Sequence, residues 1–152
     1  MVGRRDQYDQ RRPPPARLPQ GYLREGYFDA KGNLRPEVIT DLAEEVARAL
    51  GNARPGMAST QLRRFYNKTR FIKQRLESGT AWDKVVSDIH SLKRDAANAV
   101  GKENAPRIFK DFIDVNVQLA VQNKESFIKG FLQHFESVVA YRKYQESTLS
   151  RF

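Results

Sequence analysis

The sequence predicts an all-α fold, a compact bundle of about five helices. Apolar residues recur at spacings of three and four from residue 36 onward, as on the buried face of a helix. No long stretch alternates with a period of two, so a sheet is not expected. The 152 residues are 39% hydrophobic, which suits one core. We therefore expect a single helical-bundle domain over residues 21–152, preceded by a tail over residues 1–20.

The tail is defined by proline and arginine. Residues 1–20 hold four of the seven prolines, three of them consecutive at residues 13–15. Proline lacks an amide hydrogen and restricts the residue before it, so neither a helix nor a central strand is expected. The segment predicts a flexible basic tail, disordered in isolation. Such a tail is either a solvated extension or an arm that becomes ordered on RNA or on a neighbouring subunit.

The expected elements follow in order. Residues 21–35 predict a hairpin-like segment that lays Tyr27, Phe28 and Leu34 on the core, with a turn between them. Pro36 suits the first position of a helix over residues 36–50, and Gly51 suits its C-terminal cap. Later helices are expected over residues 60–77, from 82 to about 100, from 106 to near 123, and from 127 to about 144. Five phenylalanines at helical spacing in the last two predict core: Phe109, Phe112, Phe127, Phe131 and Phe135.

The helix expected over residues 60–77 has two different faces. Ser59 can cap it, and its apolar stripe predicts burial of Leu62, Phe65, Ile72 and Leu76. Residues 59–76 contain six basic residues and no acidic one, although the whole chain has a net charge of +9. A basic face without compensating acids is typical of a surface that meets a polyanion. The candidate RNA-binding residues are Arg63, Arg64, Lys68, Arg70 and Arg75. The alternative is a face that is solvated or meets an acidic protein.

The sequence contains no catalytic constellation. It has no cysteine, and its two histidines, His90 and His134, lack a second ligand at helical spacing. The carboxylates of Asp111 and Asp114 lie beside Lys110 and are expected to form an ordinary polar face. No nucleotide, nucleophile-elbow or zinc-protease motif occurs. We therefore predict no catalytic residue, no metal site and no cofactor. The absence of an apolar run of membrane length and of a secretory signal predicts a cytoplasmic protein without a membrane partner.

Three segments carry a resemblance to a known family. They are residues 26–34, with Gly26-Tyr27-Phe28-Asp29 and Gly32-Asn33-Leu34; Ser59-Thr60-Gln61-Leu62-Arg63-Arg64-Phe65-Tyr66-Asn67; and residues 131–144, with Phe135-Glu136-Ser137-Val138-Val139-Ala140-Tyr141. In this order they resemble the small subunit of the type III-A CRISPR effector, the Csm complex. The second segment is the most specific, because it joins a cap, a core stripe and a basic face. The arginine- and proline-rich tail lies outside the family pattern.

The resemblance implies a small all-helical protein that is not an enzyme. It would be present in several copies, stacked head to tail along the backbone that carries the crRNA, where it helps to bind crRNA and target RNA. In that family, target RNA cutting belongs to the backbone subunit, whereas DNA cutting and cyclic oligoadenylate synthesis belong to the large subunit. The partners implied are crRNA, target RNA, the other Csm subunits and further copies of the chain.

Two other classes of function fit the residues. A freestanding helical nucleic-acid-binding protein would bind strongly to duplex as an isolated monomer. A scaffold whose basic residues face an acidic protein partner would co-purify without RNA. An enzyme is the reading with least support, because no motif supplies its chemistry.

Overall fold

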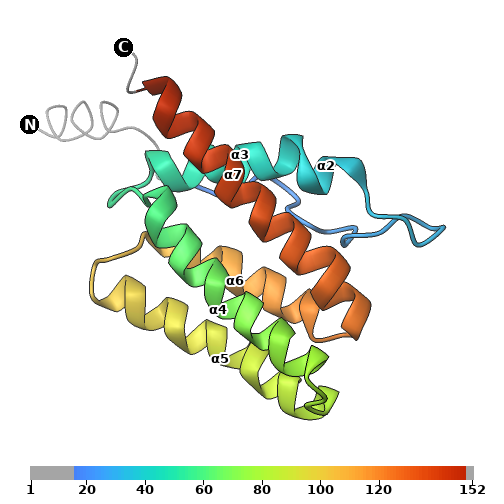
Figure 1. The fold of residues 1–152 in the computed structure, drawn as a ribbon. Coiled ribbons are helices and arrows are strands. Elements are labelled where there is room, and N and C mark those ends of the chain that lie inside the picture. The colour runs from blue at the N-terminus through green and yellow to red at the C-terminus, as the bar shows by residue number, and fades with distance from the viewer. Residues whose placement is uncertain (1–15, 150–152) are drawn as a thin grey trace, which may run out of the picture.

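We describe the protein from a computed structural model in which residues 16–149 are placed (Figure 1). Five helices of 12 residues or more form the body of this part of the chain: α3 (Asp41–Asn52), α4 (Ser59–Glu77), α5 (Trp82–Gly101), α6 (Arg107–Ala120) and α7 (Leu132–Leu149). A short helix, α2 (Pro36–Ile39), precedes α3, and a π-helix, η1 (Ser126–Phe131), runs directly into α7. The described residues form no β-strand, so the predicted all-α class is confirmed.

The helices pack mainly as sequential antiparallel neighbours. Helix α4 turns back into α5, α5 packs on α6, and α6 packs on η1 (Figure 1). Helix α7 then lies against both α3 and α4, which brings the last helix of the chain beside the first long one. This closure places the outer side of α4 on the surface, between the edges that α5 and α7 form.

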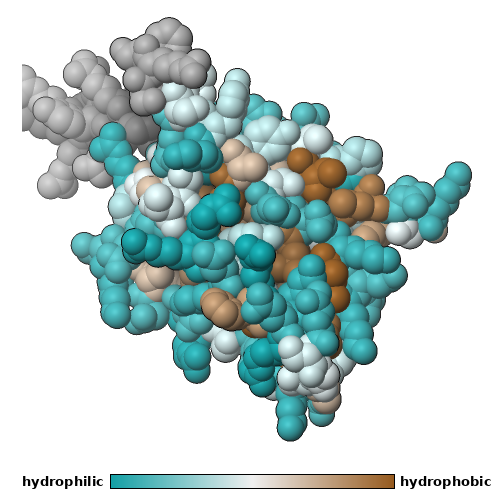
Figure 2. All heavy atoms as spheres, in the orientation of Figure 1, coloured by the Kyte–Doolittle hydropathy of each residue, from teal (hydrophilic) through white to brown (hydrophobic). Residues whose placement is uncertain are grey.

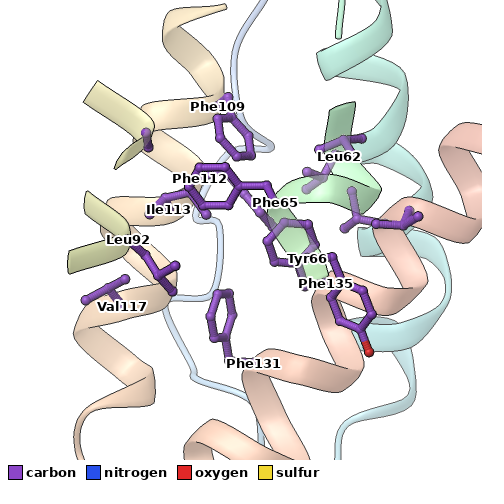
Figure 3. Close-up of a cluster of buried hydrophobic side chains, with 14 of the residues drawn as sticks. Leu62, Phe65, Tyr66, Leu92, Phe109, Phe112, Ile113, Val117, Phe131 and Phe135 are labelled. Atoms are coloured by element: carbon purple, nitrogen blue, oxygen red, sulfur yellow. The ribbon is translucent and has the colours of Figure 1, made fainter. Parts of the chain in front are cut away.

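Aromatic side chains fill the centre of the bundle. The five phenylalanines predicted as core are all fully buried, which confirms that prediction. Phe65 of α4 meets Phe109 of α6 edge to face, with ring centroids 4.7 Å apart. Phe112 meets Phe135 of α7 in the same way at 5.2 Å (Figure 3). Edge-to-face pairs add about 0.5–1.5 kcal/mol each to the area they bury, so these rings fix how α4, α6 and α7 pack together.

The predicted helix over residues 36–50 is wrong in two respects. It continues through Gly51 to Asn52, so that Ala53 and not Gly51 is the C-cap, and it is broken at Thr40. Thr40 has φ −126° and ψ −105°, which are not helical values, and its hydroxyl donates to the carbonyl of Pro36 at 2.8 Å. In an unbroken helix the Val38 carbonyl would accept the amide of residue 42. Here that carbonyl faces Nδ1 of His134 at 2.6 Å. The break therefore frees one backbone acceptor for α7.

The hairpin-like segment is confirmed and reaches the core. An isolated antiparallel bridge joins Phe28 and Leu34, and Oδ1 of Asp29 accepts two turn amides at 2.9 Å. Tyr27 is buried against Gly130 of the π-helix, where an added Cβ would lie 2.3 Å from the tyrosine ring. Only glycine leaves room for this contact, so the segment and η1 fit each other closely.

A buried hydrogen-bond network attaches this N-terminal segment to the bundle. His134 Nδ1 must donate, because its partner is the Val38 carbonyl, so Nε2 accepts from the Tyr22 hydroxyl at 2.5 Å. The Tyr22 oxygen in turn accepts from Asn116 Nδ2 at 3.0 Å, and Asn116 Oδ1 accepts from Tyr27 at 2.6 Å. Burial lowers the pKa of His134 to about 4, although the hydrogen bond to Val38 opposes the shift. His134 is therefore a neutral structural residue.

The tail predicted over residues 1–20 lies mostly outside the described residues. Within the described part, Ala16 and Leu18 are half-buried against the core. The body of the protein thus has packing contacts on both sides of the predicted boundary at residue 20.

Candidate nucleic-acid interface

Helix α4 buries one face and presents a basic one. Its fully or nearly buried side chains include Leu62, Phe65 and Ile72, as predicted, whereas Leu76 is only half-buried. The prediction for Leu76 was therefore too strong, because this residue lies in the last turn, where the neighbouring helices cover less of α4. All five candidate RNA-binding side chains are exposed: Arg63, Arg64, Lys68, Arg70 and Arg75. Figure 2 shows mostly hydrophilic side chains along α4, with some hydrophobic ones among them.

Two of the five candidates are paired with acids of α5. Lys68 Nζ lies 3.7 Å from Asp95, and Arg75 donates to Asp88 at 2.5 Å. Lys68 and Arg75 are seven residues apart, and so are Asp88 and Asp95. Seven residues make two helical turns, so the two ion pairs form a ladder between antiparallel helices. Sequence reasoning missed Asp88 and Asp95, although their matching spacing of seven was a usable signal. Lys68 also lies 4.9 Å from the centroid of the Phe65 ring.

The other three candidates have a different environment. Within residues 16–149, Arg63, Arg64 and Arg70 form no ion pair. Burial raises the pKa of Tyr66, Glu136 of α7 raises it further, and the charges of Arg70 and Arg63 lower it. These two arginines therefore lie near the α7 edge of α4. Their charges are free to meet an anion.

The start of α4 is held by the end of α7. Ser59 is the first residue of the helix rather than its cap, which corrects the expectation, and its amide donates to Glu146 at 3.0 Å. Its hydroxyl donates to the same carboxylate. Burial raises the pKa of Glu146, but the bonds from Ser59 and the charges of Arg142 and Lys143 outweigh burial and hold the pKa below its usual value. A carboxylate at a helix N-terminus is electrostatically favourable, so this contact fixes the basic face against the bundle.

The remaining titratable residues show no reactive arrangement. His90 is exposed. Oδ2 of Asp114 accepts from Lys110 at 2.6 Å, whereas Oδ1 of the same carboxylate is buried without a hydrogen-bond partner in the described part of the chain. Among residues 16–149, no three histidines or carboxylates gather closely enough to hold a metal ion. The same residues include no helix with the length and hydropathy of a membrane span. The basic face of α4 is therefore the feature of the described surface that most clearly suggests a binding role.

The comparison with protein families bears directly on this arrangement. A family model described as Csm2 Type III-A matches residues 33–148. The chain belongs to the Csm2 family. Csm2 is the small subunit of the type III-A CRISPR Csm complex and is a structural family, generally non-catalytic. The resemblance found in the sequence is thereby confirmed. Its second and third segments lie within the matched residues, whereas the first begins before them. Neither a curated protein nor a solved structure matches the chain.

Proposed function

We propose that this Csm2 protein is a non-catalytic subunit that binds crRNA and target RNA through the outer face of α4. The observation that supports this most strongly is the state of Arg63, Arg64 and Arg70: exposed, and without an ion pair among the described residues. Guanidinium groups donate paired hydrogen bonds to phosphate oxygens, and binding releases counterions from the RNA. Three such groups on one rigid helix can meet neighbouring phosphates together.

The binding we propose is independent of sequence. In a guided complex, base pairing with the guide reads the target, so the protein needs contacts only to the backbone. The ladder from Lys68 and Arg75 to α5 is consistent with this role, because it holds the outer face in one orientation. Exposed ion pairs are worth at most about 1 kcal/mol, so these two cations can also exchange a carboxylate for a phosphate.

Several copies would extend the basic face along the RNA. Head-to-tail stacking needs two different surfaces that complement each other. Residues 25–58 carry six acidic and four basic side chains, although the whole chain has a net charge of +9. This charge asymmetry supports stacking in which the α2–α3 side of one copy meets a more basic surface of the next.

The test removes the three unpaired arginines together. In the full-length chain, R63A/R64A/R70A should weaken binding of single-stranded RNA and flatten its salt dependence. Each lost phosphate contact lowers the slope of log affinity against log salt by about 0.7, so three contacts lower it by about 2. Alanine favours the helix, so circular dichroism should not change. Two unrelated strands should lose affinity by the same factor.

A matched variant controls for net charge. R24A/K31A/K124A removes three exposed cations that lie outside α4 and α5, and it should leave affinity and slope nearly unchanged. An unchanged slope in the α4 variant would overturn the phosphate contact and favour an acidic protein partner. Equal losses in both variants would mean that total charge, not this face, binds the RNA.

A further inference from the structure

The ring of Phe71 lies on the basic face of α4, away from the core. Its exposed fraction is 67%, the highest of the large hydrophobic side chains in the described residues. The apolar stripe of Leu62, Phe65 and Ile72 occupies the other side of the helix, so Phe71 cannot turn into the core without rotating α4. Leaving a phenylalanine in water gives up about 1.5–3 kcal/mol of burial, so an exposed ring at this place needs a reason.

Polar groups surround the ring. Asn67, Arg70, Phe71 and Gln74 line an open hollow of about 290 Å³. Asn67 and Gln74 lie one turn before and one turn after Phe71, and their amides both donate and accept hydrogen bonds. Arg70 adds one of the unpaired guanidinium groups described above. The lining of the hollow thus combines an aromatic ring, two amide groups that can form hydrogen bonds, and a cation.

This combination matches one nucleotide unit of a single strand. An unpaired base stacks on an aromatic side chain, its edge meets amide groups, and its phosphate meets arginine. We propose that Phe71 stacks on an unpaired nucleobase of the bound RNA, with Arg70 on the adjacent phosphate and Asn67 and Gln74 beside the base. This inference rests on the proposed function and adds a base contact to the phosphate contacts.

The surroundings favour RNA over an apolar protein partner. An interface core for a protein groups several apolar side chains and is poor in charge. Phe71 is instead a single ring among amides and guanidinium groups, and residues 59–76 contain no acid to neutralise them. A protein partner would have to bury those cations, whereas an RNA strand supplies phosphates at the same spacing as its bases.

The experiment distinguishes a contact of Phe71 with a nucleobase from a contact with the phosphate backbone. Full-length protein is titrated with an oligouridine strand and with an abasic phosphodiester strand of equal length. Stacking on one base predicts that F71A weakens binding of oligouridine about 5- to 150-fold and leaves binding of the abasic strand unchanged. F71W should retain the affinity of the wild type. F71L keeps apolar area but has no π face, and it should lose affinity as F71A does.

The outcomes distinguish this inference from the proposed function. If R63A/R64A/R70A weakens both strands but F71A weakens neither, the base contact is overturned and the phosphate contact stands. If F71L binds as well as the wild type, or if F71A weakens both strands equally, stacking is overturned. If F71A binds both strands normally but enters the reconstituted Csm complex less well, the ring contacts protein and the proposal fails. Circular dichroism of each variant should match the wild type, because the ring is exposed.

Discussion

Polar groups are bonded within the protein in the buried network, whereas on the outer face of α4 several cations have no charged partner among the described residues. In the buried network, every donor of Tyr22, Tyr27, Asn116 and the His134 ring has an acceptor within the protein. On the outer face of α4, three guanidinium groups have no charged partner among the described residues. A buried polar group that lacks a partner costs about 1–3 kcal/mol, so the partners within this network contribute to stability. An exposed cation is solvated at little cost and stays available for a ligand. Stability should therefore depend on the first region and binding on the second.

The largest effect is expected on the inner side of α4. Phe65→Ala removes a ring that packs against Phe109 and Phe135, and the cavity should lower the free energy of unfolding by about 3–5 kcal/mol. Urea denaturation followed by circular dichroism measures it. Phe71→Ala, on the same helix but exposed, is the matched control and should change stability little. Wild-type stability of Phe65→Ala would contradict the packing described.

Acid should act on the network next. The pKa of His134 is about 4 in the folded protein, against about 6.5 for an unfolded histidine. The unfolded state therefore binds the proton first, and stability falls as pH drops from about 6.5 to about 4, by about 3 kcal/mol in total. This contribution is fully present above pH 6.5. Urea denaturation across this range measures the slope. His134→Gln lacks the titrating ring and should show a shallower slope, and equal slopes would contradict the buried neutral imidazole.

Removal of the central amide should cost slightly less. Asn116→Ala removes the nearer acceptor of the Tyr27 hydroxyl, which keeps only the backbone carbonyl of residue 116 at 3.4 Å, and it removes the side-chain donor to the Phe112 carbonyl. We expect a loss of about 2–3 kcal/mol in the free energy of unfolding, measured by urea denaturation. RNA affinity at temperatures where the variant is folded should not change, because the network lies away from the α4 face. A parallel loss of affinity would mean that the two regions are coupled.

The ladder between α4 and α5 should give the smallest effect on stability. Asp88→Asn removes the charge that Arg75 faces, which should cost less than about 1 kcal/mol. Under the proposed function the same change releases a cation toward RNA, so affinity should rise and the salt slope should steepen by up to about 0.7. Anisotropy titrations at several salt concentrations check both. Weaker RNA binding by Asp88→Asn would show that the ladder's positioning of Arg75 matters more than its charge.

Local spacing predicted most of the fold, and long-range contacts decided the rest. The apolar stripe of α4 and the five buried phenylalanines could be predicted, because helical periodicity depends on near neighbours. The break at Thr40 could not, since the Val38 carbonyl that it frees meets His134, 96 residues further along the chain. The π-helix could not either, because it accommodates Tyr27 at Gly130. The exposure of the five candidate RNA-binding side chains followed from the amphipathic pattern of α4. The ion pairs of Lys68 with Asp95 and of Arg75 with Asp88 could not be predicted without knowing that α5 packs beside α4.

The network also sets an order of events during synthesis. Tyr22 and Val38 leave the ribosome early, but their partners in α7 follow 112 and 96 residues later. Local helices form quickly, whereas contacts between distant segments wait for the chain to close. At translation rates of about 5–20 residues per second, Tyr22 and Val38 wait for about 5–20 seconds before their hydrogen-bond partner exists. Over that interval the Tyr22 hydroxyl and the Val38 carbonyl remain open to water or to a chaperone, so the start of the described chain cannot complete its native contacts before α7 is made.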